Sequence, residues 1–368
     1  MSMTGRLTIN LSALAHNYAQ FHRGSPAQFA AVVKADSYGL GVEAVAKKLW
    51  DEGCREFFVA FTSEGSALRR VLGEAKIYVL AGVSPKSEEA VQALLADRLI
   101  PVLNTLEQCR YWANTQAPAA LHVDTGMSRL GMAVDSVAQD ISGLNLNIDL
   151  LVSHYARADE FEHSFNALQS QRLNAAYSAL RAHYPTLRLS LANSAGSFTL
   201  QANQALKIQD DGLSHLDRVG IGLYGGHPFS AGGSQHNKAL KPVVGLYGQV
   251  LQVRQVAAGT PVGYGSTHIM PKASRLAVLD VGYADGLPRL LSNNGRAYFA
   301  GEYCAIVGRI SMDATIVDVG DLEVAEGDWF ELMGAQISVD EVASQAQTIT
   351  FEILTGLSRR LTKVYIED

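Results

Sequence analysis

The sequence has few cysteines, no large excess of charge of either sign and no long hydrophobic run. Cys54, Cys109 and Cys304 are widely spaced, and none stands in a C-x-x-C or C-H context, so neither a disulfide framework nor a cysteine-based metal site is predicted. A reducing compartment, the cytoplasm, is therefore expected. The formal net charge is -6 with acids and bases interspersed, which favours neither a nucleic acid nor an anionic membrane as partner.

Membrane and export signals are also missing. No apolar stretch approaches the ~20 residues that span a bilayer, and residues 1–18 lack the apolar core and cleavage site of a signal peptide. A hydrophobic fraction of 48% and a charged fraction of 18% are typical of a globular protein with a large core. The length of 368 residues exceeds the size at which a single core stops growing, so two domains are expected.

Short apolar runs, rich in β-branched and aromatic residues, recur through the first part of the chain. They fall at residues 29–33, 57–61, 76–80, 99–103, 119–123, 148–152, 187–191 and 216–221. Residues 42–50, 85–98 and 165–180, which lie between such runs, have the spacing of amphipathic helices. Alternation of buried strands and helices predicts a parallel sheet, and the eight repeats favour a (β/α)8 barrel over a doubly wound sheet.

The sequence pattern changes after residues 225–239, which are rich in Gly, Ser and His and show no hydrophobic periodicity. Beyond them, strand-like runs alternate with Gly-containing turns, and little helix is expected before residues 351–361. The predicted domains are residues 11–231, an α/β barrel, and residues 232–368, a mainly β domain. The strand-like segment within residues 1–10 is expected to pair with the second domain.

Polar side chains lie at the ends of five of the expected barrel strands, on the face where such barrels form their active sites. Four strands are followed by Lys34, Asp124 with Arg129, Ser153 with His154, and Asn193 with Ser194; the last strand holds Arg218 and ends in Gly220 and Gly222. The last two turns offer N–H and hydroxyl donors to a phosphate. Desolvation lowers the pKa of a lysine at a core strand and frees its amine for a Schiff base. Together with Arg218 as a partner for a pyridine nitrogen, these groups indicate pyridoxal phosphate in an enzyme acting on amino acids.

Simpler explanations exist for each group alone. An isolated Lys34 reaches solvent, His154 is a core histidine, and both arginines pair with neighbouring acids. Only their convergence at the strand ends favours a site. Residues 220–225, GIGLYG, match the dinucleotide-binding pattern, but neither a helix nor a well-spaced acid follows. Residues 154–163 hold His, Asp and Glu at spacings that fit no standard ligand set, so no metal is expected.

Seven motifs in order resemble those of bacterial alanine racemases, pyridoxal-phosphate enzymes of fold type III. They are VVKADSYGLG (32–41), DTGMSRLG (124–131), ANSAG (192–196), RVGIGLYG (218–225), GYGST (263–267), GYADG (282–286) and GRISMD (308–313). The resemblance runs from about Leu7 to the carboxyl end. Each motif alone is weak, but seven in the family's order are specific.

The resemblance implies that L- and D-alanine are interconverted by two bases on opposite faces of one carbanion. Lys34 would carry the cofactor and act on one face, and Tyr264 of a partner subunit, tuned by His154, would act on the other, so a homodimer would share its active sites. Implied cofactor contacts are Lys34, Tyr38, His154, Asn193, Ser194, Arg218, Gly220, Ile221 and Tyr365. Implied substrate contacts are Arg129, Met312 and Tyr283. Arg218 would keep its proton and limit delocalisation into the pyridine ring.

The chain also departs from the family pattern, at Asp36, Leu40, Val219 and His268. His122 stands where several members have a lysine modified to a carbamate; that modification cannot occur on a histidine, so something other than a carbamate must orient Arg129. A racemase for serine or another amino acid, a decarboxylase of the same fold, and a non-catalytic pyridoxal-phosphate-binding protein stay open as alternatives. The sequence also leaves open a biosynthetic or a catabolic role.

Overall fold

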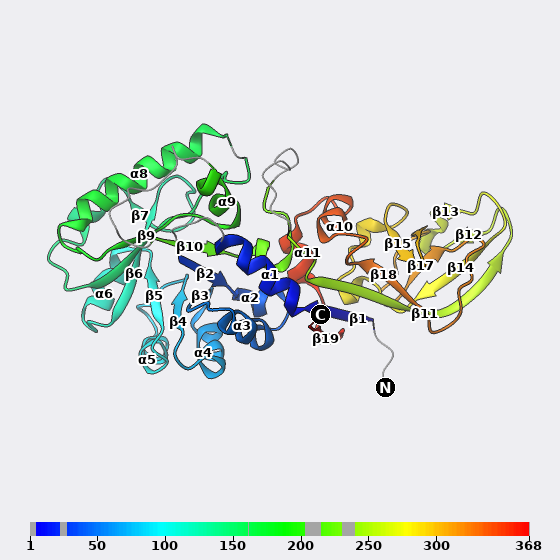
Figure 1. The fold of residues 1–368 in the computed structure, drawn as a ribbon, viewed down its shortest axis with the longest axis horizontal. Helices are drawn as coiled ribbons and strands as arrows, with labels where there is room; N and C mark the ends of the chain where they lie inside the picture. Colours follow the sequence, from blue (N-terminus) through cyan, green and yellow to red (C-terminus); the bar gives the residue numbers. More distant parts are fainter. Residues whose placement is uncertain (1–4, 23–27, 161, 203–214, 230–239, 368) are drawn as a thin grey trace.

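The computed structural model describes residues 5–22, 28–160, 162–202, 215–229 and 240–367, which form two lobes side by side (Figure 1). The first lobe contains the strands and helices coloured blue to green. The second is mainly β, in yellow to red, and the strand nearest the amino terminus belongs to it. Within the described residues, no helix is both long and apolar enough to cross a membrane.

Eight parallel strands of the first lobe form a nearly closed barrel in the order β10-β2-β3-β4-β5-β6-β8-β9. They are β2 (Gln28–Val32), β3 (Glu56–Val59), β4 (Lys76–Val79), β5 (Ile100–Leu103), β6 (Pro118–Asp124), β8 (Asn147–Val152), β9 (Arg188–Ser190) and β10 (Leu216–Val219). The Ser190 hydroxyl donates to Leu216 O at 2.5 Å and the Arg218 N–H to Ala192 O at 2.9 Å, which links β9 to β10. Every strand lies within two residues of a predicted run, so the barrel prediction is confirmed.

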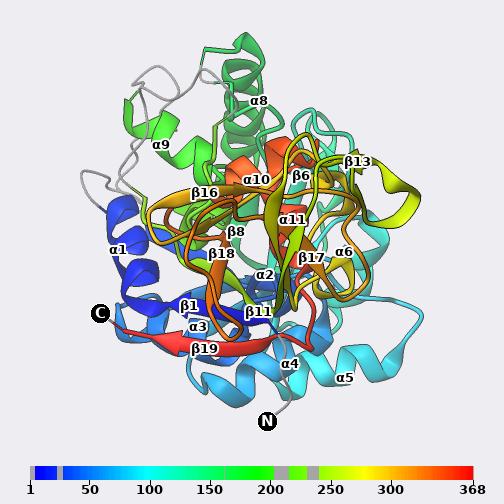
Figure 2. The same cartoon turned by 90° about the vertical axis from the view of Figure 1, so that its right-hand side faces the viewer.

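Helices follow these strands and surround the barrel (Figures 1 and 2). They are α1 (Leu11–His22), α2 (Lys34–Tyr38), α3 (Val42–Asp51), α4 (Thr62–Val71), α5 (Glu88–Ala96), α6 (Leu106–Ala113), α7 (Val137–Asp140), α8 (Ser164–Arg181), α9 (Ser194–Ala202) and the 3-10 helix η2 (Ile221–Tyr224). The three predicted helices are found as α3, α5 and α8; α5 begins at Glu88 because the Ser87 hydroxyl caps it by accepting from Ala90 N–H at 3.2 Å. A short strand, β7 (Met132–Ala133), pairs with β6.

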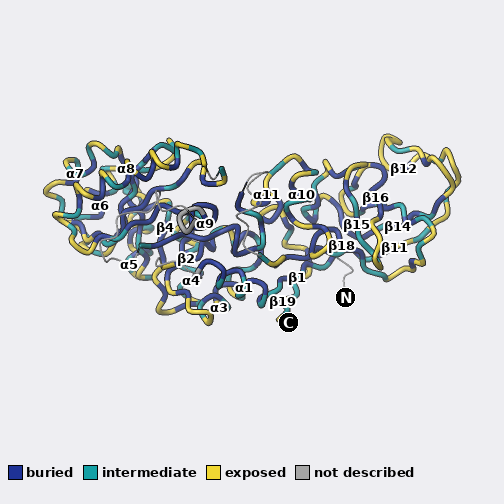
Figure 3. The backbone as a smooth tube through the Cα atoms, turned by 45° about the horizontal axis from the view of Figure 1, so that its top comes forward, coloured by how far each residue is buried: buried dark blue, intermediate teal, exposed yellow. Residues whose placement is uncertain are grey.

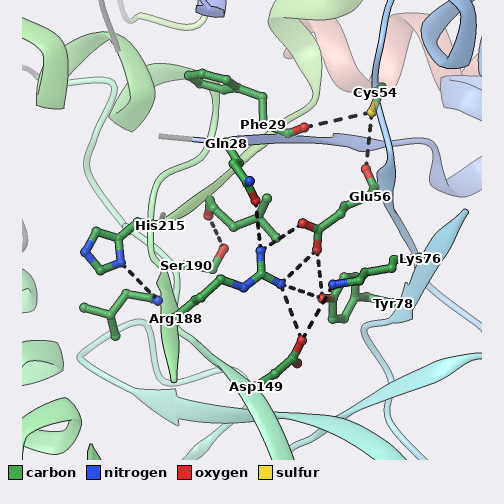
Figure 4. A network of polar contacts seen from close by, with 12 residues as sticks. Gln28, Phe29, Cys54, Glu56, Lys76, Tyr78, Asp149, Arg188, Ser190 and His215 are labelled. Atoms are coloured by element: carbon green, nitrogen blue, oxygen red, sulfur yellow. Dashed lines mark hydrogen bonds and ion pairs between the residues drawn. The ribbon is translucent and has the colours of Figure 1, made fainter. Parts of the chain in front are cut away.

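A polar network closes the amino-terminal end of the barrel (Figure 4). Arg188, the first residue of β9, donates to both carboxylate oxygens of Glu56 at 2.8 and 3.0 Å, and Glu56 is the first residue of β3. Tyr78 of β4 donates its hydroxyl to Glu56 at 2.9 Å. Arg188 also contacts Asp149 of β8 at 3.5 Å. Strands from opposite sides of the barrel are thereby joined at the end that lies away from Lys34.

The second lobe is built on an eight-stranded sheet. Its strands are β1 (Arg6–Asn10), β11 (Val244–Val256), β14 (Ser274–Leu279), β15 (Arg296–Phe299), β16 (Glu302–Ala305), β17 (Thr315–Asp318), β18 (Trp329–Met333) and β19 (Thr362–Ile366), with a hairpin of β12 (Pro261–Val262) and β13 (His268–Ile269). Helices are η4 (Tyr264–Ser266), η5 (Tyr283–Asp285), η6 (Arg289–Leu291), α10 (Val339–Gln345) and α11 (Thr350–Gly356).

The mainly β character of this lobe is confirmed, whereas α10 was not predicted. β1 pairs antiparallel with β11 and parallel with β19, both strands of this lobe. The predicted boundary between residues 231 and 232 lies outside the described residues and stays a prediction. In Figure 3 the buried parts of the backbone follow the strands of both lobes, and the exposed parts follow loops and outer helix faces.

Candidate active site

Lys34 follows β2 and begins α2, which is a left-handed turn. Ala35, Asp36, Ser37 and Tyr38 all have φ between 53° and 58°. This conformation costs an L-residue about 1–2 kcal/mol, so the surroundings must hold it. Glu64 does so in part, because its carboxylate accepts from Ala35 N–H at 2.7 Å and from Ala60 N–H at 2.7 Å. No glycine among these residues signals the turn, and sequence reasoning missed both it and Glu64.

A pocket of about 590 Å³ opens beside Lys34. It is lined by Lys34, Ala35 and Tyr38 from the barrel and by Thr348, Ile349, Phe351, Glu352 and Thr355 from the segment around α11. Burial lowers the pKa of the Lys34 amine, Arg129 lowers it further, and Glu64 opposes them. The site therefore holds a lysine that is more readily deprotonated than a solvated one. The wall from α11 had no signal in the sequence, since it comes from the other lobe.

The turns after β9 and β10 meet at the Ser194 hydroxyl. This oxygen accepts from the N–H of Gly220 at 2.9 Å and of Gly222 at 3.3 Å. Ser194 begins α9 and Ile221 begins η2, so their own N–H groups have no partner within those helices. The Tyr38 hydroxyl lies so close to Gly220 that a Cβ there would come within 2.5 Å of it. Two helix starts and two hydroxyl groups thus converge as an anion site, which fits a phosphate.

Arg218, buried in β10, is held by four of its five N–H groups. Nη1 donates to Ser190 O at 2.9 Å and to its hydroxyl at 2.6 Å, and Nη2 donates to Ser153 O at 2.6 Å and to His154 Nδ1 at 3.0 Å. The Nε–H makes no hydrogen bond within the described part of the chain and is available to a ligand acceptor. Burial lowers the pKa of Arg218 to about 10, with Asp217 opposing, so the guanidinium stays charged at neutral pH.

The hydrogen bond from Arg218 fixes the tautomer of His154. Burial and the charge of Arg218 hold the pKa of His154 well below its usual range, so the ring is neutral. Since Nδ1 accepts, Nε2 carries the proton. Asn193 Nδ2 lies 3.5 Å from Nε2, but its Oδ1 accepts from Gly196 N–H at 2.9 Å, which makes Nδ2 a donor too. His154 therefore offers its Nε2–H to the site.

Arg129 extends from a turn fixed by Asp124. One carboxylate oxygen of Asp124 accepts from the N–H of Gly126, Met127 and Ser128 at 2.9, 2.8 and 3.1 Å. Burial raises the pKa of Asp124, but these N–H groups outweigh it and lower the pKa overall. Arg129 is exposed and has no hydrogen bond or ion pair among the described residues. Its charge lowers the pKa of Lys34, His122, His154 and Arg218, so it lies near all of them.

Tyr264, Tyr283 and Met312 form a second group, in the β lobe. Their residues are 71%, 41% and 53% exposed. Tyr283 N–H donates to Ser311 O at 3.0 Å, which ties the loops of Tyr283 and Met312 together. Gly263 packs on the backbone of Arg309, which brings the Tyr264 loop alongside. The Tyr264 loop does not join the barrel group within one chain, because the hairpin β12–β13, which flanks Tyr264, lies at the far end of the β lobe (Figure 1).

Tyr365 is not brought to the phosphate side. It lies on β19, and its hydroxyl donates to Leu40 O at 3.0 Å. A Cβ on Gly41 would come within 2.0 Å of that hydroxyl, so Tyr365 packs beyond α2. Phe351 is the aromatic residue of the β lobe that lines the pocket beside Tyr38, with ring centroids 5.9 Å apart. All other predicted site residues lie in the barrel group or the β-lobe group.

Comparisons with known proteins agree with this arrangement. Models of the alanine racemase N-terminal and C-terminal domains match residues 9–228 and 243–365. The catabolic alanine racemase of Agrobacterium fabrum is 40% identical over 99% of this chain and 92% of its own length, and the Brucella abortus alanine racemase is 40% identical over 98% and 93%. The Bartonella henselae alanine racemase, solved with covalently bound pyridoxal phosphate, has a TM-score of 0.86 at 36% identity over 99% of this chain and 100% of its own. The biosynthetic alanine racemase of Pseudomonas aeruginosa has a TM-score of 0.85 at 32% identity over the same shares. The chain belongs to the alanine racemase family.

Proposed function

We propose that this protein is a pyridoxal-phosphate-dependent alanine racemase that interconverts L- and D-alanine by a two-base proton transfer. The observation that carries the proposal is the arrangement at one mouth of the barrel. A lysine with a lowered pKa, an anion site of helix starts and a buried arginine with one free N–H lie together there. The relatives named above are alanine racemases, which supports the same substrate here.

The barrel residues fit pyridoxal phosphate. Lys34 would hold its aldehyde carbon, Ser194, Gly220, Ile221 and Tyr38 its phosphate, and Arg218 its pyridine nitrogen through Nε–H, with His154 and Asn193 beside the ring. When bound, the cofactor supplies an electrophilic carbon for amines and an electron-poor ring that takes up negative charge from Cα. Because Arg218 stays protonated, it donates a hydrogen bond and no proton, which restrains side reactions such as transamination.

Two bases on opposite faces of Cα are what inversion requires. Lys34 would take or return the α-proton at Nζ, since its lowered pKa makes the neutral amine more accessible than that of a solvated lysine. Tyr264 would act through its phenolic oxygen on the other face. Its exposure of 71%, in a loop at the far end of the β lobe, supports contribution from a partner subunit. We therefore infer a homodimer with shared sites, in which Met312 and Tyr283 also face the partner's barrel.

Arg129 is the group we assign to the substrate carboxylate, because its guanidinium has no acidic partner within the described residues and lies near Lys34. Met312 would add its backbone N–H, and Tyr283 would narrow the access to the pocket. No observation favours a racemase for serine, a decarboxylase or a non-catalytic carrier. Three buried, unpaired cysteines support a cytoplasmic location.

The cofactor linkage and the reaction are tested together. Borohydride reduction should fix the cofactor on Lys34, and Lys34→Ala should abolish that linkage. The purified protein should remove the optical activity of L-alanine without releasing CO2. Tyr264→Phe should slow proton exchange from one enantiomer more than from the other in single turnovers. Tyr303→Phe, at another exposed tyrosine on β16, is the control and should change neither. A linkage that persists without Lys34, or CO2 release, would refute the proposal.

A further inference from the structure

His122, on β6, has its ring held by Asn104, the residue after β5. Asn104 is 3% exposed, and its Nδ2 donates to Leu80 O at 3.0 Å and to Val102 O at 2.8 Å. Both acceptors are carbonyls, so the amide orientation is fixed and Oδ1 is the acceptor that remains. His122 Nδ1 lies 2.7 Å from that oxygen. The proton of the ring is therefore on Nδ1.

The other nitrogen of the ring carries a lone pair. Burial lowers the pKa of His122 to about 4, and the charges of Arg218 and Arg129 add to this effect, while Asp124 opposes it. The ring is thus neutral at physiological pH. With the proton on Nδ1, Nε2 is a hydrogen-bond acceptor, and it has no partner within the part of the chain that the structure describes.

The Nε2 edge of the ring faces the turn that carries Arg129. Cδ2, the ring atom bonded to Nε2, lies 3.2 Å from the point where a Cβ on Gly131 would be. Gly131 has φ of 112°, which L side chains rarely adopt, and lies two residues after Arg129. Because Asp124 fixes the start of the same turn, the loop and the imidazole keep one relative position.

We propose that His122 is a positioning residue for Arg129: its Nε2 lone pair, which has no partner in the described structure, accepts a hydrogen bond from the guanidinium when Arg129 turns toward Lys34 to meet its ligand. This inference rests on the proposed function only in naming the substrate carboxylate as the ligand of Arg129. An uncharged acceptor leaves the charge of Arg129 intact, whereas a carboxylate in this place would neutralise it. That charge then serves twice, since it attracts the substrate carboxylate and lowers the pKa of Lys34.

The tautomer is tested without any reference to activity. In the full chain with 15N-labelled histidine, His122 is assigned by the signal that disappears in His122→Gln. We expect a proton on Nδ1, a bare Nε2 and no protonation between pH 5 and 8. A proton on Nε2, or a charged ring at pH 7, overturns the inference. This measurement decides the role of His122 even if the chain does not racemise alanine.

The positioning role is tested by the split between KM and kcat. His122→Leu removes the acceptor and should raise the KM for alanine about tenfold, with a much smaller change in kcat, because Arg129 contacts the substrate in ground and transition states alike. His122→Gln keeps an acceptor oxygen near the place of Nε2 and should restore a KM close to that of the wild type. His183→Leu, on an exposed histidine, is the matched control. Equal KM values for the Leu, Gln and wild-type proteins would contradict the inference.

Discussion

Arg188→Met should destabilise the barrel strongly because it leaves the buried carboxylate of Glu56 without its charged partner. The side chains of Arg188 and Glu56 are 13% and 10% exposed, and the pair is bidentate at 2.8 and 3.0 Å. Removing one partner of a buried pair costs about 3–5 kcal/mol, mostly from the charge left unpaired. Methionine keeps most of the apolar volume, and Tyr78 still donates one hydrogen bond to Glu56, so we expect about 3 kcal/mol, the lower end of that range.

The loss should depend on pH. In the wild type, burial raises the pKa of Glu56, but the hydrogen bonds and charge of Arg188 outweigh it and lower the pKa overall. The wild-type contribution is therefore present above the unfolded pKa and lost as the pH falls through the lower, folded one. Without Arg188, burial dominates and raises the pKa of Glu56. The penalty in the variant should thus grow as the pH rises, and be smaller at pH 5 than at pH 7.5.

Urea unfolding followed by tryptophan fluorescence measures this difference, since Trp50 and Trp112 both lie on barrel helices. Lys47→Met, which removes an exposed ion pair with Glu43, is the control and should change little. Racemisation should persist below the unfolding transition, because Arg188 lies at the opposite end of the barrel from Lys34. A loss under about 1 kcal/mol, or an equal loss at both pH values, would refute the reasoning.

Two further predictions concern the lobes separately. Arg360→Gln should raise the KM for alanine several-fold at nearly constant kcat, because Arg360 ties Asp285 at 2.6 Å to Asp313 at 2.7 Å and so aligns the loops of Tyr283 and Met312; an unchanged KM in steady-state assays would contradict this. Burial raises the pKa of Asp217 to about 7 in the folded chain, so its contribution to stability declines as the pH rises toward 8. Asp217→Asn should therefore remove that decline, visible as equal Tm values at pH 5 and 8, whereas a Tm that still falls as in the wild type would argue against it.

The barrel was predictable because its strands are covered on both faces. Such strands read as short apolar runs, and their ends define where site residues gather. The position of Lys34, Arg218 and Ser194 on one mouth followed from that topology alone. The sequence did contain a local signal for the start of α10, because Ser338 caps this helix by accepting from Glu341 N–H at 3.1 Å. The surrounding Gly-rich sequence nevertheless favoured strands.

Other parts of the site depend on contacts that a linear pattern does not encode. The left-handed turn after Lys34 contains no glycine, so the conformation comes from its surroundings, such as Glu64, and not from local preference. Ile349 and Phe351 reach the pocket from the far end of the chain. Tyr365 is the opposite case: the sequence resemblance indicated a cofactor contact, but in the structure its hydroxyl donates a hydrogen bond to Leu40 O.

The two histidines show why identity alone does not define a role. Lys34, Arg129 and Arg218 already gather positive charge at the barrel mouth, and protonated histidines there would add to the repulsion. Both rings are instead neutral, but their neighbours polarise them in opposite senses. Arg218 makes Nδ1 of His154 an acceptor and leaves a donor at Nε2, whereas Asn104 makes Nδ1 of His122 a donor and leaves an acceptor at Nε2. One residue type thus supplies a donor beside the cofactor ring and an acceptor beside Arg129, each fixed by the hydrogen bond on its other nitrogen.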